Sequence, residues 1–419
     1  MDKGNSSTEK RRERVIVFDT TLRDGEQAAG VCFSKRAKVE IAGLLDAMGV
    51  DVIEAGFPAA STGEHEAVRA VAQSVKRATV CGLSRAIPAE IDTSWFALRG
   101  ARRPRLHVFL SSSEIHLAHQ LRRGADEVVE MARIAVEHAR GYTPDVEFSC
   151  MDATRSEPEL IARLVGVAIA AGATTINLPD TVGCARPEQV AAMFHEVRAR
   201  VPELQGVVAS FHGQDDLGMA TANSLAAIAA GARQVELAVN GLGERAGNTP
   251  FEEVVMALRV HGEALGVETG VDTRGIWAVS QAVAHHSGFA LPPNKAIVGG
   301  NAFRHASGIH QDGVLKRRET YEAIDPSDIG HPVGTQIVLG KLSGRAGFAA
   351  RVKAIDIALS DAELERAFAR FQSVADSRGE IGDAELTALC RDPENVRRGG
   401  TPLMCTGEAR DSTGDGNGG

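Results

Sequence analysis

The sequence has little that suits an exported, membrane-bound or nucleic-acid-binding protein. No apolar run is long enough to span a bilayer, and the polar N-terminus has no signal-peptide core. The net charge of −9 argues against a general nucleic-acid-binding surface. No Cys-x-x-Cys pair occurs among the six cysteines: Cys32, Cys81, Cys150, Cys184, Cys390 and Cys405. The sequence therefore predicts reduced thiols, a cytoplasmic location, and no nucleic-acid or membrane partner.

Short apolar segments alternate with alanine-rich segments between residues 15 and 265. The eight apolar segments, spaced by roughly 30 residues, are predicted strands: Val15–Phe18, Val52–Ala55, Thr79–Gly82, Leu106–Leu110, Val146–Ser149, Thr174–Leu178, Gly206–Phe211 and Gln234–Val239. The predicted helices between them include Lys35–Met48, Ala125–Ala139, Glu159–Ala171, Pro187–Arg200 and Ala220–Ala230. Eight strand–helix units predict an α/β fold, a (β/α)8 TIM barrel with a parallel sheet, and the alternative is a doubly wound open sheet.

The pattern changes after the eighth strand, and we predict five regions along the chain. These are a disordered N-terminus over 1–14, a catalytic barrel over 15–280, a linker or lid subdomain over 281–345, a small helical subdomain over 346–395 and a disordered tail over 396–419. Within the lid region, the segment Asn301–Gly313 is predicted to be a loop that carries two histidines.

Polar residues follow the predicted strands repeatedly. Arg23 and Asp24 come after the first strand, Glu54 closes the second and His212 follows the seventh. Barrel active sites form at the C-terminal ends of the strands, so these side chains are expected to converge. An arginine grips a carboxylate through two hydrogen bonds, and an aspartate is a ligand for divalent metals.

Several strings resemble the acetyl-CoA-dependent 2-oxo-acid synthases, the family of 2-isopropylmalate, homocitrate and citramalate synthases. The matching strings are Asp19–Gln27, Glu54–Pro58, Pro179–Gly183, Asp215–Gly218, Gly241–Asn248 and Ser307–Gly313. The resemblance covers residues from about 15 to 395, and the layout is closest to the short homocitrate synthases.

The resemblance implies a metal-assisted Claisen-type condensation of acetyl-CoA with a 2-oxo acid, with release of CoA. The product would be a 2-hydroxy-2-carboxymethyl acid such as homocitrate, isopropylmalate or a phosphonate analogue. The implied cofactor is a divalent metal, with Mg²⁺ or Mn²⁺ favoured and Zn²⁺ or Co²⁺ as alternatives, and acetyl-CoA is the co-substrate. The resemblance also implies a homodimer, because residues after the barrel complete the site in this family.

Residue roles carry over position by position. The implied metal ligands are Asp24, His212, Gln214 and Asn248, and the implied catalytic residues are Arg23, Glu54, His310 and Tyr321. The implied substrate-binding residues are Gln27, His107, Ser149, Thr181 and His305.

Two positions depart from the family pattern. The family's His-x-His reads His212-Gly213-Gln214, and its glutamate after the fifth strand is replaced by Met151. An amide oxygen is a neutral, hard ligand that favours Mg²⁺ or Mn²⁺ over Zn²⁺, whereas a thioether cannot transfer a proton. The neighbouring Asp152 is expected to point away, because successive side chains of a strand alternate. The alternative hypothesis is an impaired or repurposed homologue, either a binding protein or a related carbon–carbon lyase.

Overall fold

The computed structural model describes residues 12–391, which form two compact units. The barrel unit comprises residues 12–303 and 324–334, and the second unit comprises residues 304–323 and 335–391. The predicted disordered tail over 396–419 and the predicted disordered N-terminus up to residue 11 lie outside the described residues. The prediction of disorder up to residue 14 is wrong at its end, because β1 (Glu13–Arg14) pairs with β10 (Val267–Glu268).

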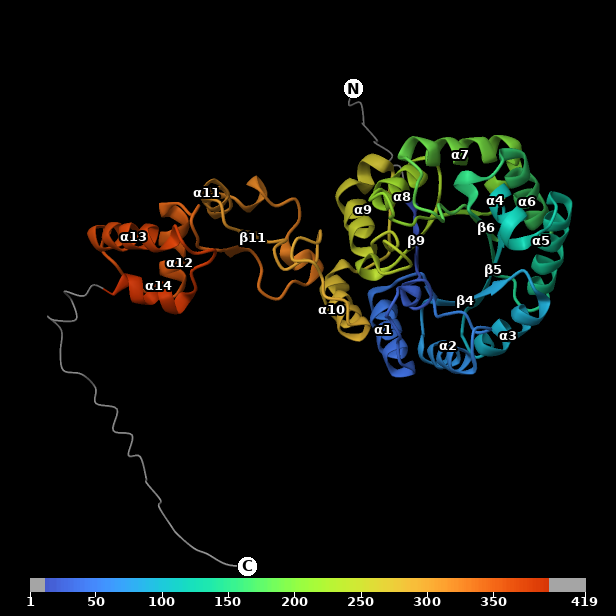
Figure 1. Ribbon diagram of the computed structural model, residues 1–419, viewed down its shortest axis with the longest axis horizontal. Coiled ribbons are helices and arrows are strands. Elements are labelled where there is room, and N and C mark those ends of the chain that lie inside the picture. Colours follow the sequence, from blue (N-terminus) through green and yellow to red (C-terminus); the bar gives the residue numbers. More distant parts are fainter. Residues whose placement is uncertain (1–11, 392–419) are drawn as a thin grey trace, which may run out of the picture. The chain divides into compact units, whose positions relative to one another are not determined.

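Eight parallel strands close into a barrel in sequence order, as the ring of arrows in Figure 1 shows. They are β2 (Ile16–Asp19), β3 (Val52–Glu54), β4 (Thr79–Arg85), β5 (Pro104–Ser111), β6 (Val146–Met151), β7 (Thr175–Asn177), β8 (Val208–His212) and β9 (Gln234–Leu237). Because β2 pairs with both β3 and β9, the sheet has no edge. The (β/α)8 prediction is confirmed, and a doubly wound open sheet is excluded.

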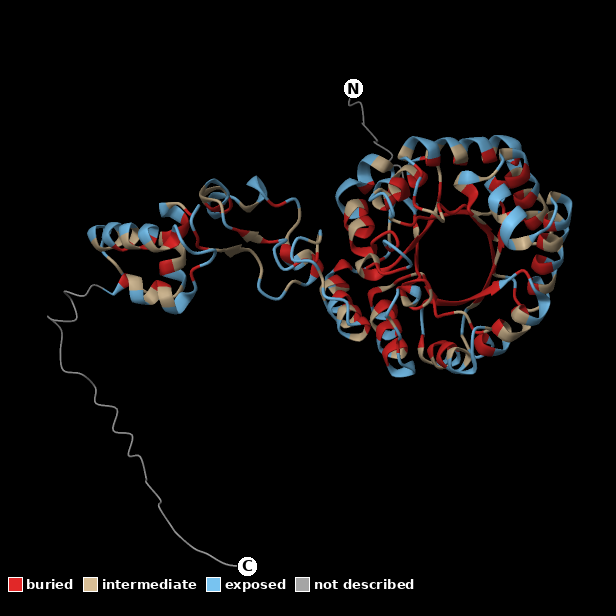
Figure 2. Ribbon diagram, viewed as in Figure 1, coloured by how far each residue is buried: buried red, intermediate tan, exposed pale blue. Residues whose placement is uncertain are grey.

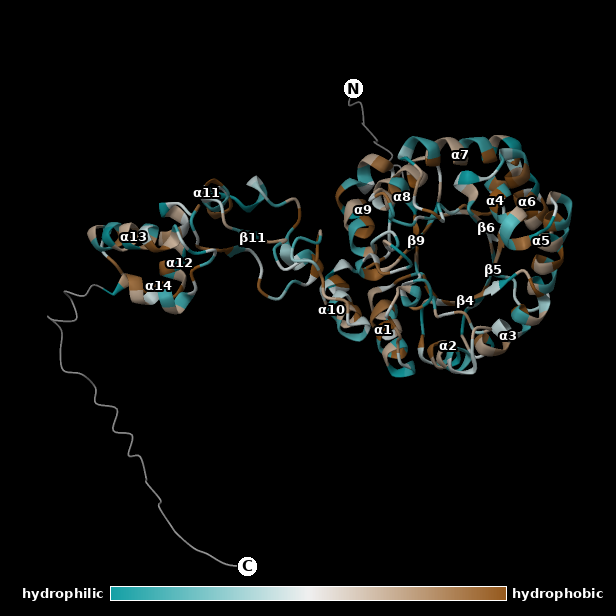
Figure 3. Cartoon of the chain, in the orientation of Figure 1, coloured by the Kyte–Doolittle hydropathy of each residue, from teal (hydrophilic) through white to brown (hydrophobic). Residues whose placement is uncertain are grey.

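Helices surround the barrel and carry both hydrophobic and hydrophilic stretches (Figure 3). The longer ones are α1 (Lys35–Met48), α2 (Thr62–Ser74), α3 (Pro88–Leu98), α5 (Ala125–Arg140), α6 (Pro158–Ala170), α7 (Pro187–Arg200), α8 (Ala220–Ala229), α9 (Phe251–Leu265) and α10 (Ile276–Ser287). Their ends follow capping chemistry: the Ser34 side chain accepts a hydrogen bond from the backbone N–H of Ala37, and α1 stops at Gly49 with φ of 80°.

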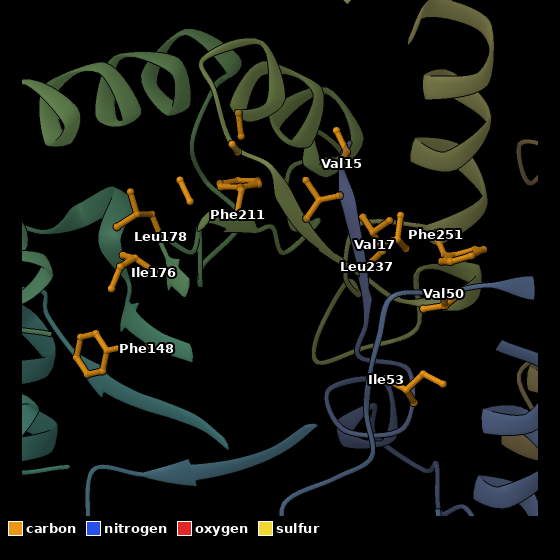
Figure 4. Close-up of a cluster of buried hydrophobic side chains, with 14 of the residues drawn as sticks. Val15, Val17, Val50, Ile53, Phe148, Ile176, Leu178, Phe211, Leu237 and Phe251 are labelled. Atoms are coloured by element: carbon orange, nitrogen blue, oxygen red, sulfur yellow. The ribbon is translucent and has the colours of Figure 1, made fainter. Parts of the chain in front are cut away.

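The strands alternate between an apolar outer face and a polar inner face. Phe148, Ile176 and Phe211 belong to the buried cluster between the strands and the helices (Figure 4). Their strand neighbours Glu147 and Ser149 take part instead in polar contacts across the barrel interior. Figure 2 shows the resulting ring of buried strands. The inner face therefore carries the chemistry, and the outer face carries the packing.

The second unit has its own small core, formed by Phe348, Phe371 and Leu386 among others. Its helices are α11 (Gly308–Lys316), α12 (Arg345–Ala354), α13 (Asp361–Ala375) and α14 (Asp383–Cys390), and its two short strands, β11 (Arg304–His305) and β12 (Gln336–Ile337), pair in parallel.

The predicted loop at Asn301–Gly313 is wrong from Gly308 onward, where α11 begins. Gln311 and Val314, one turn apart, are the buried residues of this helix, and the Gln311 amide donates to the backbone oxygens of His305 and Val338. A polar residue thus supplies part of the helix's packed face, which masks the usual apolar period.

The described cysteines are free thiols, three of them buried and two exposed, Cys32 and Cys184. Among the helices of residues 12–391, none has both the length and the apolar composition needed to cross a membrane.

Candidate active site

A cavity of about 230 Å³ lies at the C-terminal ends of the barrel strands. Eight of the predicted site residues line it: Arg23, Asp24, Gln27, His107, Ser149, Thr181, His212 and Gln214. Met151 and the non-predicted Asn177, Glu236 and Arg245 also line the cavity. The closed barrel thus gathers lining residues from the ends of all eight strands around one space.

One side of the cavity is an ion-paired cluster around Glu54, which is fully buried. Arg23 Nε donates to Glu54 Oε2 at 2.6 Å, and Arg23 Nη1 donates to Asp24 Oδ2 at 2.9 Å. Thr20 Oγ1 donates to the same Glu54 oxygen at 2.7 Å. Two of the three guanidinium nitrogens are therefore held by carboxylates, and Nη2 is left to contact a ligand.

A hydrogen-bonded chain runs from Glu54 across the barrel. His107 Nδ1 lies 2.8 Å from Glu54 Oε1, and His107 Nε2 lies 2.7 Å from Ser149 Oγ. Asn177 Nδ2 donates to the same Ser149 hydroxyl at 2.8 Å. Since an ionised carboxylate only accepts hydrogen bonds, Nδ1 carries a proton and His107 is fixed in one orientation.

The charges in this chain reinforce one another. Burial alone would raise the pKa of Glu54, but the positive charges of Arg23 and His107 outweigh it and lower that pKa to about 2. For His107, burial disfavours the charged ring, yet the neighbouring Glu54 carboxylate raises the pKa above its usual value. The pair therefore favours an ionised carboxylate beside a protonated imidazole.

A second cluster, which shares Asp24 with the first, comprises Asp24, His212 and Gln214. Asp24 Oδ2 lies 3.5 Å from His212 Nε2, and Gln214 Nε2 lies 3.3 Å from Asp24 Oδ2 and 3.2 Å from His212 Nε2. His212 Nδ1 hydrogen-bonds to Glu236 at 2.9 Å, the carboxylate support that metal-binding histidines usually have. Burial lowers the pKa of His212, but Glu236 outweighs it and raises that pKa.

These residues fit a divalent metal. The Gln214 Oε1 atom is buried and has no hydrogen-bond partner among the described residues. The separation of Asp24 and His212 is close to that of two atoms bound to one ion at about 2.1 Å. One carboxylate, one imidazole and one amide make an oxygen-rich donor set.

Two of the predicted residues lie differently from their neighbours. Asn248 does not line the cavity: its Nδ2 donates to the Leu242 carbonyl at 2.9 Å, and its Oδ1 is buried without a partner among the described residues. Thr181 Oγ1 accepts a hydrogen bond from the Asp152 backbone N–H at 2.9 Å while lining the cavity. The Asp152 carboxylate points away, as predicted, and binds Arg155 and Ser113.

Three predicted site residues belong to the second unit. The rings of His310 and Tyr321 stack with centroids 3.9 Å apart, and His305 Nε2 lies 2.9 Å from Glu322 Oε1. The Tyr321 side chain is exposed. The structure therefore brings His310 and Tyr321 together, and their roles in catalysis stay predictions.

Sequence reasoning missed Glu236, Asn177 and the apolar wall of the cavity. The wall consists of Phe57, Leu83, Phe109 and Pro179, together with Met151, which the sequence had marked as a departure from the family pattern. The period of two was a usable signal for the polar pair, because Glu236 and Asn177 alternate with apolar residues on their strands. The other four wall residues carry no such mark, since they come from four separate positions on the rim.

Comparisons with known proteins agree with this architecture. A family model described as HMGL-like matches residues 14–283, and a model described as homocitrate synthase post-HMGL domain-like matches residues 297–379. The chain is 50% identical over 384 residues to a 2-isopropylmalate synthase of Methylorubrum populi, covering 92% of this chain and 74% of the relative. It is 52% identical over 382 residues to a 2-isopropylmalate synthase of Nitrosococcus oceani, covering 91% and 75%.

Among solved structures, the HMG-CoA lyase of Bacillus subtilis has a similar fold, with a TM-score of 0.58 and 22% identity. The match covers 67% of this chain and 96% of the lyase.

Proposed function

Because the chain belongs to the HMGL-like family, in its 2-isopropylmalate/homocitrate synthase-like branch, and is therefore a transferase of the acetyl-CoA-condensing type, we propose that it condenses acetyl-CoA with a branched, apolar 2-oxo acid. The product class is that of the relatives' 2-isopropylmalate, which is a two-carbon acetate unit joined to 3-methyl-2-oxobutanoate. CoA leaves when the thioester is hydrolysed.

The observation that carries the substrate class is the apolar wall of the cavity. Phe57, Leu83, Phe109 and Met151 face the space in which the oxo acid's side chain would lie. A dicarboxylic or phosphonic oxo acid needs a second cation there. Each lining cation of this kind is already paired: Arg23 with Asp24 and Glu54, Arg245 with Asp216, and the His107 ring with Glu54. An apolar side chain therefore suits this cavity better than a second anionic group.

The polar residues of the cavity have complementary roles in this proposal. Asp24, His212 and Gln214 hold a divalent metal, with Mg²⁺ or Mn²⁺ favoured by the oxygen donors, while Asn248 positions the adjoining loop. When bound, the metal acts as a Lewis acid toward the oxo group. Arg23 and Thr181 hold the carboxylate, and Gln27 contacts the polar end of the substrate. His305, His310 and Tyr321 complete the site, and we propose that a homodimer brings them to it.

The test is a thiol-release assay with acetyl-CoA, Mg²⁺ or Mn²⁺, and a panel of 2-oxo acids. The expected order places 3-methyl-2-oxobutanoate above 2-oxoglutarate and phosphonopyruvate in kcat/KM. The matched variant Leu83→Ala enlarges the cavity at its apolar wall and should shift the substrate preference toward 2-oxo acids with bulkier apolar side chains. Preference for 2-oxoglutarate would overturn the substrate class, and no thiol release with any acid would favour an impaired or repurposed homologue.

A further inference from the structure

The cavity wall carries few groups able to move a proton. Its ionisable residues are Arg23, Asp24, His107, His212, Glu236, Glu244 and Arg245. The two arginines remain protonated and are held by carboxylates. Asp24 and His212 belong to the candidate metal cluster, and Glu236 is hydrogen-bonded to His212. His107 and Glu244 are left, and of these His107 is buried in a fixed network whereas Glu244 is exposed.

His107 lies beside Ser149 at the cavity, and its Nε2 atom is hydrogen-bonded to the Ser149 hydroxyl. Both residues line the space, and Ser149 lies two positions before Met151 on the inner face of β6. The Ser149 hydroxyl is held from two sides, by His107 Nε2 at 2.7 Å and by Asn177 Nδ2 at 2.8 Å. Behind the ring, Glu54 is itself anchored by Arg23 and Thr20. Four strands therefore fix the geometry of one hydroxyl group.

We propose that Glu54, His107 and Ser149 form a proton-transfer chain that opens into the cavity at the Ser149 hydroxyl and protonates the oxygen of the 2-oxo carbon as the new carbon–carbon bond forms. The proposal rests on the condensation proposed above. The proposal gives these three residues a proton transfer that the neighbouring Met151 cannot perform, because a thioether has no proton to donate.

The hydrogen bonds determine the direction of transfer. With a proton on Nε2, His107 and Asn177 both donate to Ser149 Oγ, so the hydroxyl proton is free for a substrate oxygen. In the transfer, the Oγ–H bond breaks as the substrate O–H bond forms, and the Nε2–H bond breaks as Oγ regains a proton. His107 is left neutral with its Nδ1–H on Glu54. Water returns the proton afterwards, and the proton lost from the acetyl methyl group closes the count.

The surroundings of His107 favour the loaded state. The titratable and charged groups near the ring are Glu54 from β3, Cys81 from β4, Glu147 from β6 and Glu236 from β9, with Arg23 and Arg105 beyond Glu54 and Glu147. The Phe18 ring packs against the His107 ring in a T-shaped arrangement, with the ring centroids 5.9 Å apart, and adds no charge. Carboxylates outnumber cations around the ring, which raises the pKa of His107 despite its burial.

The experiment compares Ser149→Ala with the wild type in thiol release at saturating substrates. The loss expected in kcat is about 100-fold or more, as for removal of a general acid, with a smaller change in KM. The fall of kcat at high pH, which marks loss of the proton from His107, should disappear in this variant. Ser149→Thr keeps a hydroxyl and should recover most of the activity.

Two further variants make the test specific. Ser210→Ala removes another buried serine, one that accepts from Gln234, and should keep kcat within about twofold of the wild type. Placing Ser149→Ala in a Met151→Glu background should cost less than it does alone, because the new carboxyl group offers a second proton donor. Thermal unfolding of each variant checks that the barrel remains folded.

The outcomes separate the two proposals. An active wild type whose Ser149→Ala variant keeps its kcat and pH profile, with only KM raised, overturns the proton-transfer chain alone and leaves Ser149 a binding residue. If the fall of kcat at high pH disappears in Glu244→Gln but persists in Ser149→Ala, the proton donor is Glu244. That result also overturns the proton-transfer chain. A wild type that releases no thiol with any acid overturns the condensation, and the proton-transfer chain with it.

Discussion

Two sets of residues around the cavity differ in how their buried polar atoms are satisfied. In the paired set, Arg23, Glu54 and His107 have hydrogen-bonding partners of opposite charge or complementary type. In the open set, Gln214, Glu236 and Asn177 each keep one buried oxygen without a partner among the described residues. A buried polar atom without a partner costs free energy, so the paired set is preorganised and the open set leaves oxygens available to a ligand.

The largest expected effect on activity and stability comes from disrupting the paired set at Glu54. Glu54→Gln removes the carboxylate that holds both Arg23 and His107 and leaves two buried cations without it. We expect about a 1,000-fold loss in kcat/KM and about 3–5 kcal/mol of lost stability in urea unfolding. The control Glu90→Gln breaks an exposed pair with Arg85 and should change stability by less than about 0.5 kcal/mol. Equal losses of stability in the Glu54→Gln and Glu90→Gln variants would contradict the contrast between the paired set and the open set.

A buried carboxyl group without a cation should respond to pH in the opposite way from Glu54. Burial raises the pKa of Asp19 to about 7, although hydrogen bonds from Thr21 oppose the shift. As pH rises, the unfolded chain loses this proton first, so the group lowers stability from about pH 4 until about pH 7. Asp19→Asn should therefore gain stability relative to the wild type, by up to about 4 kcal/mol, between pH 4 and pH 8.

The measurement is urea unfolding of both proteins at several pH values, and the difference between them isolates Asp19 from the other titrating groups. Asparagine keeps an oxygen that accepts from Thr21, so the low-pH comparison serves as the control. A difference that stays constant with pH would show that Asp19 is ionised in the folded protein.

Asp24 lies between the paired set and the open set, since it binds Arg23 and faces His212 and Gln214. Asp24→Ala should weaken Mn²⁺ or Mg²⁺ binding by about 100-fold or more in titration calorimetry, because the charged ligand is lost. Gln214→Ala removes only a neutral ligand and should weaken binding by less than about tenfold. Identical isotherms for wild type and Asp24→Ala would remove Asp24 from the metal site.

The smallest expected effect comes from restoring the family pattern at Gln214 and Met151. The double variant Gln214→His, Met151→Glu should raise activity by a few-fold to about tenfold and should bind Zn²⁺ more tightly relative to Mg²⁺. Thiol release and competitive metal titration measure the two changes. Flat activity in the double variant would mean that Gln214 and Met151 do not limit the reaction.

The sequence predicted the barrel because its signals are local. Eight strands with helices between them, and the positions of Asp24 and His212 near the C-terminal ends of strands, follow from short-range patterns. The same locality explains the error at Gly308–Lys316, where the buried Gln311 concealed the packed face of the helix. The orientation of Asp152 was predicted from strand alternation, but this residue lies beyond the end of β6 with φ of 70°, so the turn decides where its carboxylate points.

Long-range contacts were outside the reach of such patterns. Gln214 and Asp24 are 190 residues apart in sequence, and they meet only because β9 pairs with β2 and closes the ring. The chain from Glu54 through His107 to Ser149 crosses separations of 53 and 42 residues. The residues alone therefore determined the fold and the kind of chemistry at its rim. Barrel closure decided which charges are paired and which polar atoms stay open to a ligand, because those distances depend on the register of all eight strands.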